Sequence, residues 1–148
     1  MRNYGLPVFF LVVLAIAIML ACGSPASRID PSCSAAPTAT NPSMPQSITV
    51  CPAVADAQDY PNGQVQFVAI GTFQTAPSPA LAKAEVWGVC QNDAATTAVA
   101  ISSSGVAQCE PGSTGTYSVY GSDWTTCEHV GPCGTGCMVT GYAKLTCP

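Results

Sequence analysis

The chain predicts an all-β fold, an antiparallel β-sandwich of about seven strands that follows an N-terminal apolar segment and a linker. Short runs rich in β-branched and aromatic residues recur at about ten-residue spacing from Ser47 onward. Glycine, proline, serine and asparagine separate these runs. After the N-terminal segment, apolar residues three and four apart occur only as a weak patch at 79–83.

The predicted strands cover residues 47–52, 63–73, 84–90, 96–102, 105–109, 115–121 and 138–147. In the second strand Phe67 and Ala69 alternate with Gln66, which is the period of a half-buried strand. The expected core residues are Phe67, Phe73, Trp87, Tyr117, Val119 and Leu145. The serines and glycines of 98–121 fall where strands turn, so this stretch is interpreted as architecture and not as a reactive loop.

The N-terminus combines a basic Arg2 with an apolar run from Val8 to Leu20 that is short for a bilayer span. The run ends in Met19-Leu20-Ala21-Cys22-Gly23, which resembles the lipobox of bacterial lipoproteins, although Met19 replaces the commoner leucine. The resemblance implies a signal peptide at 1–21, lipidation of Cys22 and a lipid-anchored place in the bacterial cell envelope, in the outer membrane, periplasm or at the surface. A secretory signal cut near Ala21 and an uncleaved anchor are the alternatives.

The odd number of cysteines agrees with lipidation of Cys22. An exported protein with nine cysteines must leave one unpaired. If Cys22 carries lipid, eight remain, and an oxidising compartment would pair them in four disulfides.

Residues 22–46 are rich in proline, serine, alanine and threonine and have no apolar period. Such a segment cannot bury enough apolar surface to offset its ordering entropy, so we expect a lipidated, extended linker. In polyproline form its 24 residues after Cys22 would reach about 70 Å. A disulfide from Cys33 to the domain would shorten that reach.

The charge balance excludes two classes of partner. Four basic residues stand against eight acidic ones, a formal net charge of -4. Binding to nucleic acid or to anionic lipid through a polybasic patch needs the opposite balance, so the expected membrane contact is the lipid alone.

Several motifs of 47–148 together resemble the bacterial immunoglobulin-like domain of group 2, the module of intimin- and invasin-type adhesins. They are the ITV of the first strand, the glycine-to-phenylalanine run 63–73, Trp87, the VAISSSG turn at 99–105, Pro111-Gly112 and the GYAKL of the last strand. The resemblance implies an immunoglobulin-like sandwich and a non-enzymatic role in binding, adhesion or structural display, with no catalytic residue and no cofactor. The cysteines and the long segment 122–139 depart from the family pattern.

Immunoglobulin-like folds place the first and last strands side by side, which predicts a Cys51–Cys147 disulfide. A Cys90–Cys109 disulfide would join the ends of the third and fifth strands. The pairing of the rest stays open between a link from linker to loop and a loop closed on itself. These cysteines are Cys33, Cys127, Cys133 and Cys137.

The segment from Cys127 to Cys137 carries the alternative hypothesis, an envelope metal-binding or catalytic protein. It offers three sulfurs and His129, a set that zinc accepts, but it lacks C-x-x-C spacing and an oxidising envelope favours disulfides. His129 is the single histidine and no G-x-S-x-G motif accompanies it. Asp56 and Asp59 precede a turn where calcium could bind, although ordinary turn-forming and solubilising roles are the favoured interpretation. A purely structural spacer is the other alternative.

Tyr120, Trp124 and Tyr142 fall on outward positions or in the long segment, so they are the candidate contacts with a protein or glycan ligand. Val68 and Ile70 form an apolar patch on the outer face of the second strand, which we expect the cysteine-rich segment to cover.

Overall fold

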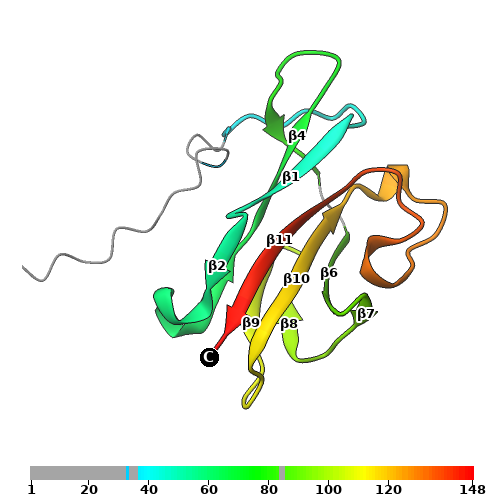
Figure 1. Ribbon diagram of the computed structural model, residues 1–148. Helices are drawn as coiled ribbons and strands as arrows, with labels where there is room; N and C mark the ends of the chain where they lie inside the picture. The colour runs from blue at the N-terminus through cyan, green and yellow to red at the C-terminus, as the bar shows by residue number, and fades with distance from the viewer. Residues whose placement is uncertain (1–32, 34–36, 84–85) are drawn as a thin grey trace, which may run out of the picture.

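The computed structural model describes residue 33 and residues 37–83 and 86–148, and in them the protein is all-β (Figure 1). The helical elements among these residues are single 3-10 turns of three residues each. The predicted strand segments all contain strands, and shorter strands are added at β2 (Val54–Asp56), β5 (Ala80–Leu81) and β7 (Ala94–Ala95).

One layer combines two three-stranded sheets. Their strands are β1 (Ser47–Cys51), β4 (Val68–Thr72) and β5 (Ala80–Leu81) in one sheet, and β3 (Gln64–Gln66), β9 (Val106–Cys109) and β8 (Val99–Ile101) in the other. Only Phe67 separates β3 from β4, so the predicted strand 63–73 runs through both sheets and joins them. Its first half pairs with β9 and its second half pairs with β1, antiparallel in both cases.

The other layer is a five-stranded sheet in the order β2-β11-β10-β6-β7. Its strands are β2 (Val54–Asp56), β11 (Thr140–Cys147), β10 (Gly115–Ser122), β6 (Val86–Gln91) and β7 (Ala94–Ala95). β2 is parallel to β11, and the other pairs are antiparallel. Because β1 and β2 are nearly continuous, the first strand passes from one layer to the other. The combined order is that of an immunoglobulin-like sandwich, as expected.

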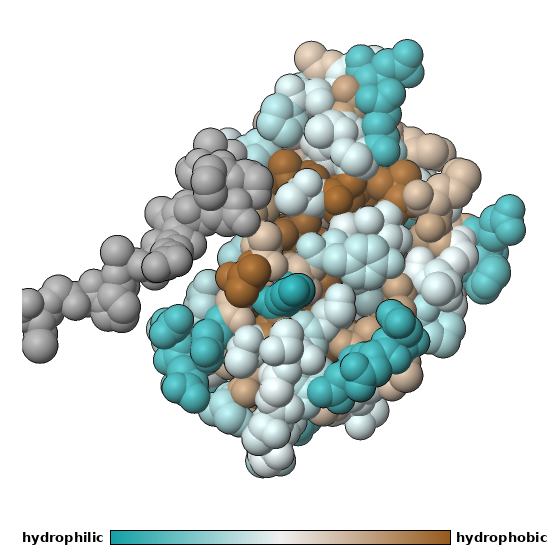
Figure 2. All heavy atoms as spheres, in the orientation of Figure 1, coloured by the Kyte–Doolittle hydropathy of each residue, from teal (hydrophilic) through white to brown (hydrophobic). Residues whose placement is uncertain are grey.

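Large apolar side chains fill the space between the layers. Phe67, Val65 and Val50 come from one layer and Leu145 and Val119 from the other, and all are fully buried. Figure 2 shows further apolar surface where β1 approaches β11. At that approach a Cβ on Gly141 would come within 2.8 Å of the Ile48 side chain, so glycine is required there.

Two aromatic residues refine the expected core. Trp87 is half-buried, and its ring lies where a Cβ on Gly121 would approach within 3.0 Å. Phe73 is buried but lies outside the main core cluster.

Tyr117 packs in the core while its hydroxyl donates to the carbonyl oxygen of Thr114, 3.0 Å away. This contact near the start of β10 is the tyrosine corner of immunoglobulin-like domains.

Residues 37–46, which belong to the predicted linker, lie against the domain. The amide of Leu81 donates to Ala39 at 2.8 Å, and Thr40 forms a parallel bridge with Leu81. The Asn41 side chain is buried, and its amide donates hydrogen bonds to the carbonyl oxygens of Thr75 and Pro77. This segment therefore covers the outer edge of β5, which would otherwise present unpaired backbone groups. The signal peptide at 1–21 and Cys22 lie outside the described residues.

Four disulfides join Cys33 to Cys51, Cys90 to Cys133, Cys109 to Cys147 and Cys127 to Cys137. Both predicted pairs, Cys51–Cys147 and Cys90–Cys109, are therefore wrong. The prediction took the end of the first strand to lie beside the end of the last one.

The strand register explains both corrections. Val54, three residues after Cys51, pairs in parallel with Lys144, three residues before Cys147, so Cys51 and Cys147 lie at opposite ends of the stretch that β2 and β11 share. Side chains two residues apart on a strand face the same side, so Cys90 lies with Gly88 on the outer face of its layer. Cys109 instead forms its disulfide with the buried Cys147, between the layers.

Removal of the disulfide between the layers should destabilise the protein more than removal of the disulfide within the loop. In the chain-entropy model the separation of 38 residues between Cys109 and Cys147 corresponds to about 4 kcal/mol. The separation of 10 residues between Cys127 and Cys137 corresponds to about 3 kcal/mol. We expect the doubly substituted Cys109→Ser, Cys147→Ser chain to show the larger fall in the free energy of unfolding, measured by denaturant titration. An equal or larger loss for Cys127→Ser, Cys137→Ser would contradict this assignment.

Candidate functional site

The most elaborate surface feature is the β10–β11 loop, residues 123–139. It contains the short helices η3 (Trp124–Thr126) and η4 (Pro132–Gly134). In an immunoglobulin-like sandwich this connection lies at the end where variable domains bind their ligands. Its length is the main departure from a simple hairpin between β10 and β11.

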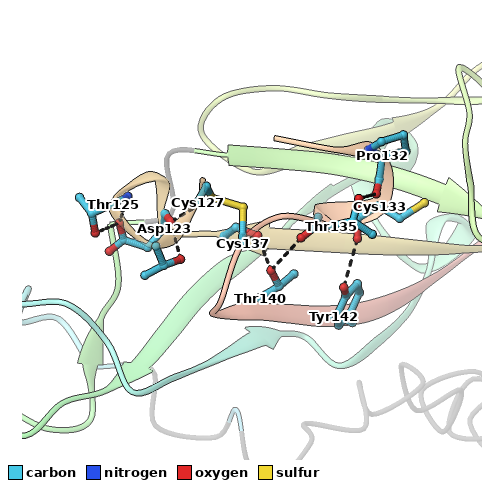
Figure 3. Close-up of a disulfide and its surroundings, with 12 residues drawn as sticks. Asp123, Thr125, Cys127, Pro132, Cys133, Thr135, Cys137, Thr140 and Tyr142 are labelled. Atoms are coloured by element: carbon cyan, nitrogen blue, oxygen red, sulfur yellow. Dashed lines mark hydrogen bonds between the residues drawn. A yellow bond between two sulfur atoms is a disulfide. The ribbon is translucent and has the colours of Figure 1, made fainter. Parts of the chain in front are cut away.

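Covalent and polar contacts hold the loop in one shape (Figure 3). The Cys127–Cys137 disulfide closes the loop on itself, and Cys90–Cys133 fastens it to β6. The buried Asp123 carboxylate accepts hydrogen bonds from the amide and the hydroxyl of Thr125, at 2.8 and 2.6 Å, and so caps η3. The loop is thus ordered without a regular strand or a long helix.

The loop folds back over the outer face of β6, β10 and β11. A Cβ on Gly134 would come within 3.1 Å of the Tyr120 ring, and any Cβ on Gly88 would collide with the Tyr120 hydroxyl. The Tyr142 hydroxyl donates to the carbonyl oxygen of Cys133 at 3.1 Å, as Figure 3 shows. Glycine at 88 and 134 therefore lets the sheet, the Tyr120 ring and the loop stack closely.

The packing of the β10–β11 loop on the outer face of the sheet corrects two predictions. Tyr120 occupies an outward position, opposite Tyr142, but it is only 8% exposed because the loop covers it. The predicted role of Tyr120 as an exposed contact is therefore wrong, whereas Trp124 and Tyr142 are 55% and 54% exposed. The loop also does not cover Val68 and Ile70, which lie in the other layer, where Ile70 pairs with Leu81 of β5.

Exposed apolar side chains concentrate on the loop. Among the described residues the large apolar side chains that remain exposed are Met44, Val54, Trp124, Val130, Met138 and Tyr142. Trp124, Val130 and Met138 belong to the loop, and Trp124 and Val130 line a groove of about 450 Å³. The opposite wall of this apolar groove includes Trp87 and Ile101. Exposed clusters of this kind are typical of interaction surfaces.

A second concavity, the polar hollow, lies on the other side of the loop and measures about 550 Å³. Its lining comes from the turn 91–93 between β6 and β7, the Cys90–Cys133 disulfide, residues 116–118 of β10, Thr135 of the loop, and Tyr142 and Lys144 of β11. Sequence reasoning identified Tyr142 but missed the turn. The Asn92-Asp93 pair between two β-type runs is a recognisable signal for a two-residue hairpin turn.

The loop chemistry does not match the zinc hypothesis. Cys127, Cys133 and Cys137 all form disulfides, which leaves no thiolate for a metal. Within residues 33, 37–83 and 86–148, no three His, Cys, Asp or Glu residues are grouped so that they could hold a metal ion. The Asp56 carboxylate accepts a hydrogen bond from the amide of Gln58 at 3.0 Å, which is the turn-forming role.

No helix in the described part of the chain has the length and apolar character needed to cross a membrane. No protein-family model matches the chain, and no curated protein is significantly similar to it.

Loss of the Cys90–Cys133 disulfide should release the loop from the sheet. Only noncovalent contacts would then hold it to the sheet, among them the Tyr142 hydrogen bond, the Thr140 hydrogen bond to Gly134 and the packing of Gly134 on Tyr120. We therefore expect amide hydrogen exchange in 128–137 to rise at least about tenfold in a Cys90→Ser, Cys133→Ser chain. Exchange in β10 and β11 should change far less. The matched control, Cys33→Ser with Cys51→Ser, should leave the loop unchanged. Unaltered exchange in the loop of the Cys90→Ser, Cys133→Ser chain would contradict the packing of the loop on the sheet.

Proposed function

We propose that the protein is a non-enzymatic bacterial cell-envelope lipoprotein whose immunoglobulin-like domain binds a protein or glycan ligand, in adhesion or surface display. One observation carries the proposal. The β10–β11 loop is cross-linked twice and holds three of the exposed large apolar side chains of the described residues, Trp124, Val130 and Met138.

Rigid display favours binding, because a loop ordered beforehand loses little conformational entropy when it meets a partner. Tryptophan is enriched among the residues that dominate binding energy, and Trp124 stands exposed beside the apolar groove. The loop therefore combines a suitable anchor with a fixed backbone.

Membership in the group 2 family of bacterial immunoglobulin-like domains is part of this proposal. The residues of the resemblance occupy matching places: Ile48 lies in β1, Trp87 in β6 and Leu145 in β11. The proposal of a bacterial envelope setting rests on this resemblance and on the lipobox-like residues before Cys22.

The Cys33–Cys51 disulfide favours binding over a purely structural spacer. Ten residues lie between the proposed lipid on Cys22 and Cys33, so the free tether is less than half as long as one that would run to residue 46. A spacer gains from length, whereas this arrangement holds the domain near the membrane.

Lipidation is tested by the intact mass of the purified native protein. Replacement of Cys22 by alanine removes the proposed acceptor thiol, so the mass added by the acyl groups and the membrane association should both disappear. The native mass should also be lower by two hydrogen atoms for each of the four disulfides. A native chain that retains Met1 and carries no lipid would contradict the anchor.

Ligand binding at the loop is tested by capture of cells with the full chain in detergent micelles. We expect Trp124→Ala with Met138→Ala to weaken capture at least about tenfold, because both side chains extend from the loop into solvent. Val54→Ala is the matched control, since Val54 is an exposed apolar residue of β2 outside the loop. Equal loss in the control, or no capture by the native chain, would argue against the proposal.

A further inference from the structure

The two concavities beside the β10–β11 loop differ in chemistry. The apolar groove contains valine, isoleucine and tryptophan side chains with two serines. The polar hollow has no valine, leucine or isoleucine side chain; its apolar surface comes from residues such as Tyr142, Tyr117 and the Cys90–Cys133 disulfide, and hydroxyl, amide, carboxylate and ammonium groups lie among them. A peptide that docks through aliphatic anchors would therefore favour the groove, and a ligand rich in hydroxyl groups would favour the hollow.

The charges of the hollow argue against an ionic ligand. Among its lining residues Lys144 is the single cation and Asp93 is the single anion, so the site carries no net charge. An anionic ligand would meet one ammonium and one carboxylate, with little net attraction. A neutral ligand can use both as hydrogen-bonding groups, because the ammonium donates and the carboxylate accepts.

The lining of the hollow is held in place before any ligand arrives. Asn92 and Asp93 form a turn with φ of 51° and 61°, and the pairing of Gln91 with Ala94 closes it. Next to the turn, the Cys90–Cys133 disulfide ties β6 to the loop wall. The Tyr142 hydroxyl is bound to Cys133, which orients a ring that is still half-exposed. Such order reduces the entropy lost on binding.

We infer that the polar hollow binds a neutral saccharide, with Tyr142 as the stacking surface and the turn 91–93 as the hydrogen-bonding wall. This inference rests on the proposed function and names the ligand class. A pyranose presents C–H bonds on one face and hydroxyl groups around its rim. The C–H face suits the negative face of an aromatic ring, and each hydroxyl both donates and accepts. The volume of about 550 Å³ lies within the range of small-molecule sites.

The hydroxyl groups of Ser118 and Thr116 form the floor of the hollow on β10. Each can rotate to donate or accept, so the floor adapts to the hydroxyl pattern of a sugar. Thr135 is already committed to its own loop, because its hydroxyl donates to the carbonyl oxygen of Pro132 at 2.8 Å. Selectivity among sugars therefore falls to the turn 91–93, which supplies an amide from each of Gln91 and Asn92 and the Asp93 carboxylate.

The test uses the full chain in detergent micelles on a printed array of neutral and acidic oligosaccharides, followed by calorimetric titration of the best neutral binder. Tyr142→Ala removes the stacking ring and should weaken binding at least about tenfold. Tyr142→Phe keeps the ring and should stay within about threefold, which separates loss of stacking from misfolding. Lys144→Gln should also stay within about threefold, with little dependence on salt.

Trp124→Ala is the matched control, because Trp124 lies on the apolar groove and not in the hollow. Retained binding in this control together with loss in Tyr142→Ala supports the inference. Binding of acidic oligosaccharides alone, abolished by Lys144→Gln, would overturn the neutral class. Binding to cells through Trp124 without binding to any oligosaccharide would overturn the inference and leave the proposed function standing. If the native chain binds neither the array nor the cells, both the inference and the proposed function are rejected.

Discussion

Burial of apolar side chains between the two layers is the constraint on which the rest of the structure depends. Phe67 lies where one strand passes from pairing with β9 to pairing with β1, and it is fully buried against the five-stranded sheet. Val119 and Leu145 meet it from that sheet. Each such side chain contributes about 2 kcal/mol when it leaves water, so the pair of layers holds together only if strand register keeps these residues inward.

That register decides what the outer face can become. With Val119 and Leu145 inward, Tyr120 and Tyr142 must point outward, since neighbouring residues of a strand face opposite sides. A tyrosine ring on an open sheet would remain in water, and the loop instead lies over Tyr120. The absence of side chains at Gly88 and Gly134 makes room for this stacking. The surfaces that the loop exposes are thus a consequence of how the sheet packs on its inner side.

The disulfides divide between two tasks. Cys109–Cys147 joins the layers near the core, and Cys33–Cys51 attaches the segment before the domain to β1. Cys90–Cys133 and Cys127–Cys137 act on the loop alone. The second pair of bridges replaces the hydrophobic packing that a loop of this length cannot provide for itself. A loop ordered in this way can expose Trp124 and Met138 without collapsing onto them.

The sequence by itself determined the all-β class, the places of the main strands and most of the core. These follow from local chemistry: β-branched and aromatic residues alternate with polar ones, and glycine, proline and serine mark the turns. It also determined that Trp124 and Tyr142 would be exposed. The tertiary structure alone decided which cysteines meet, that Tyr120 is covered, and that residues 37–46 lie against β5. Each of these depends on contacts between segments that are distant in the chain, and local periodicity does not indicate which distant segments come into contact.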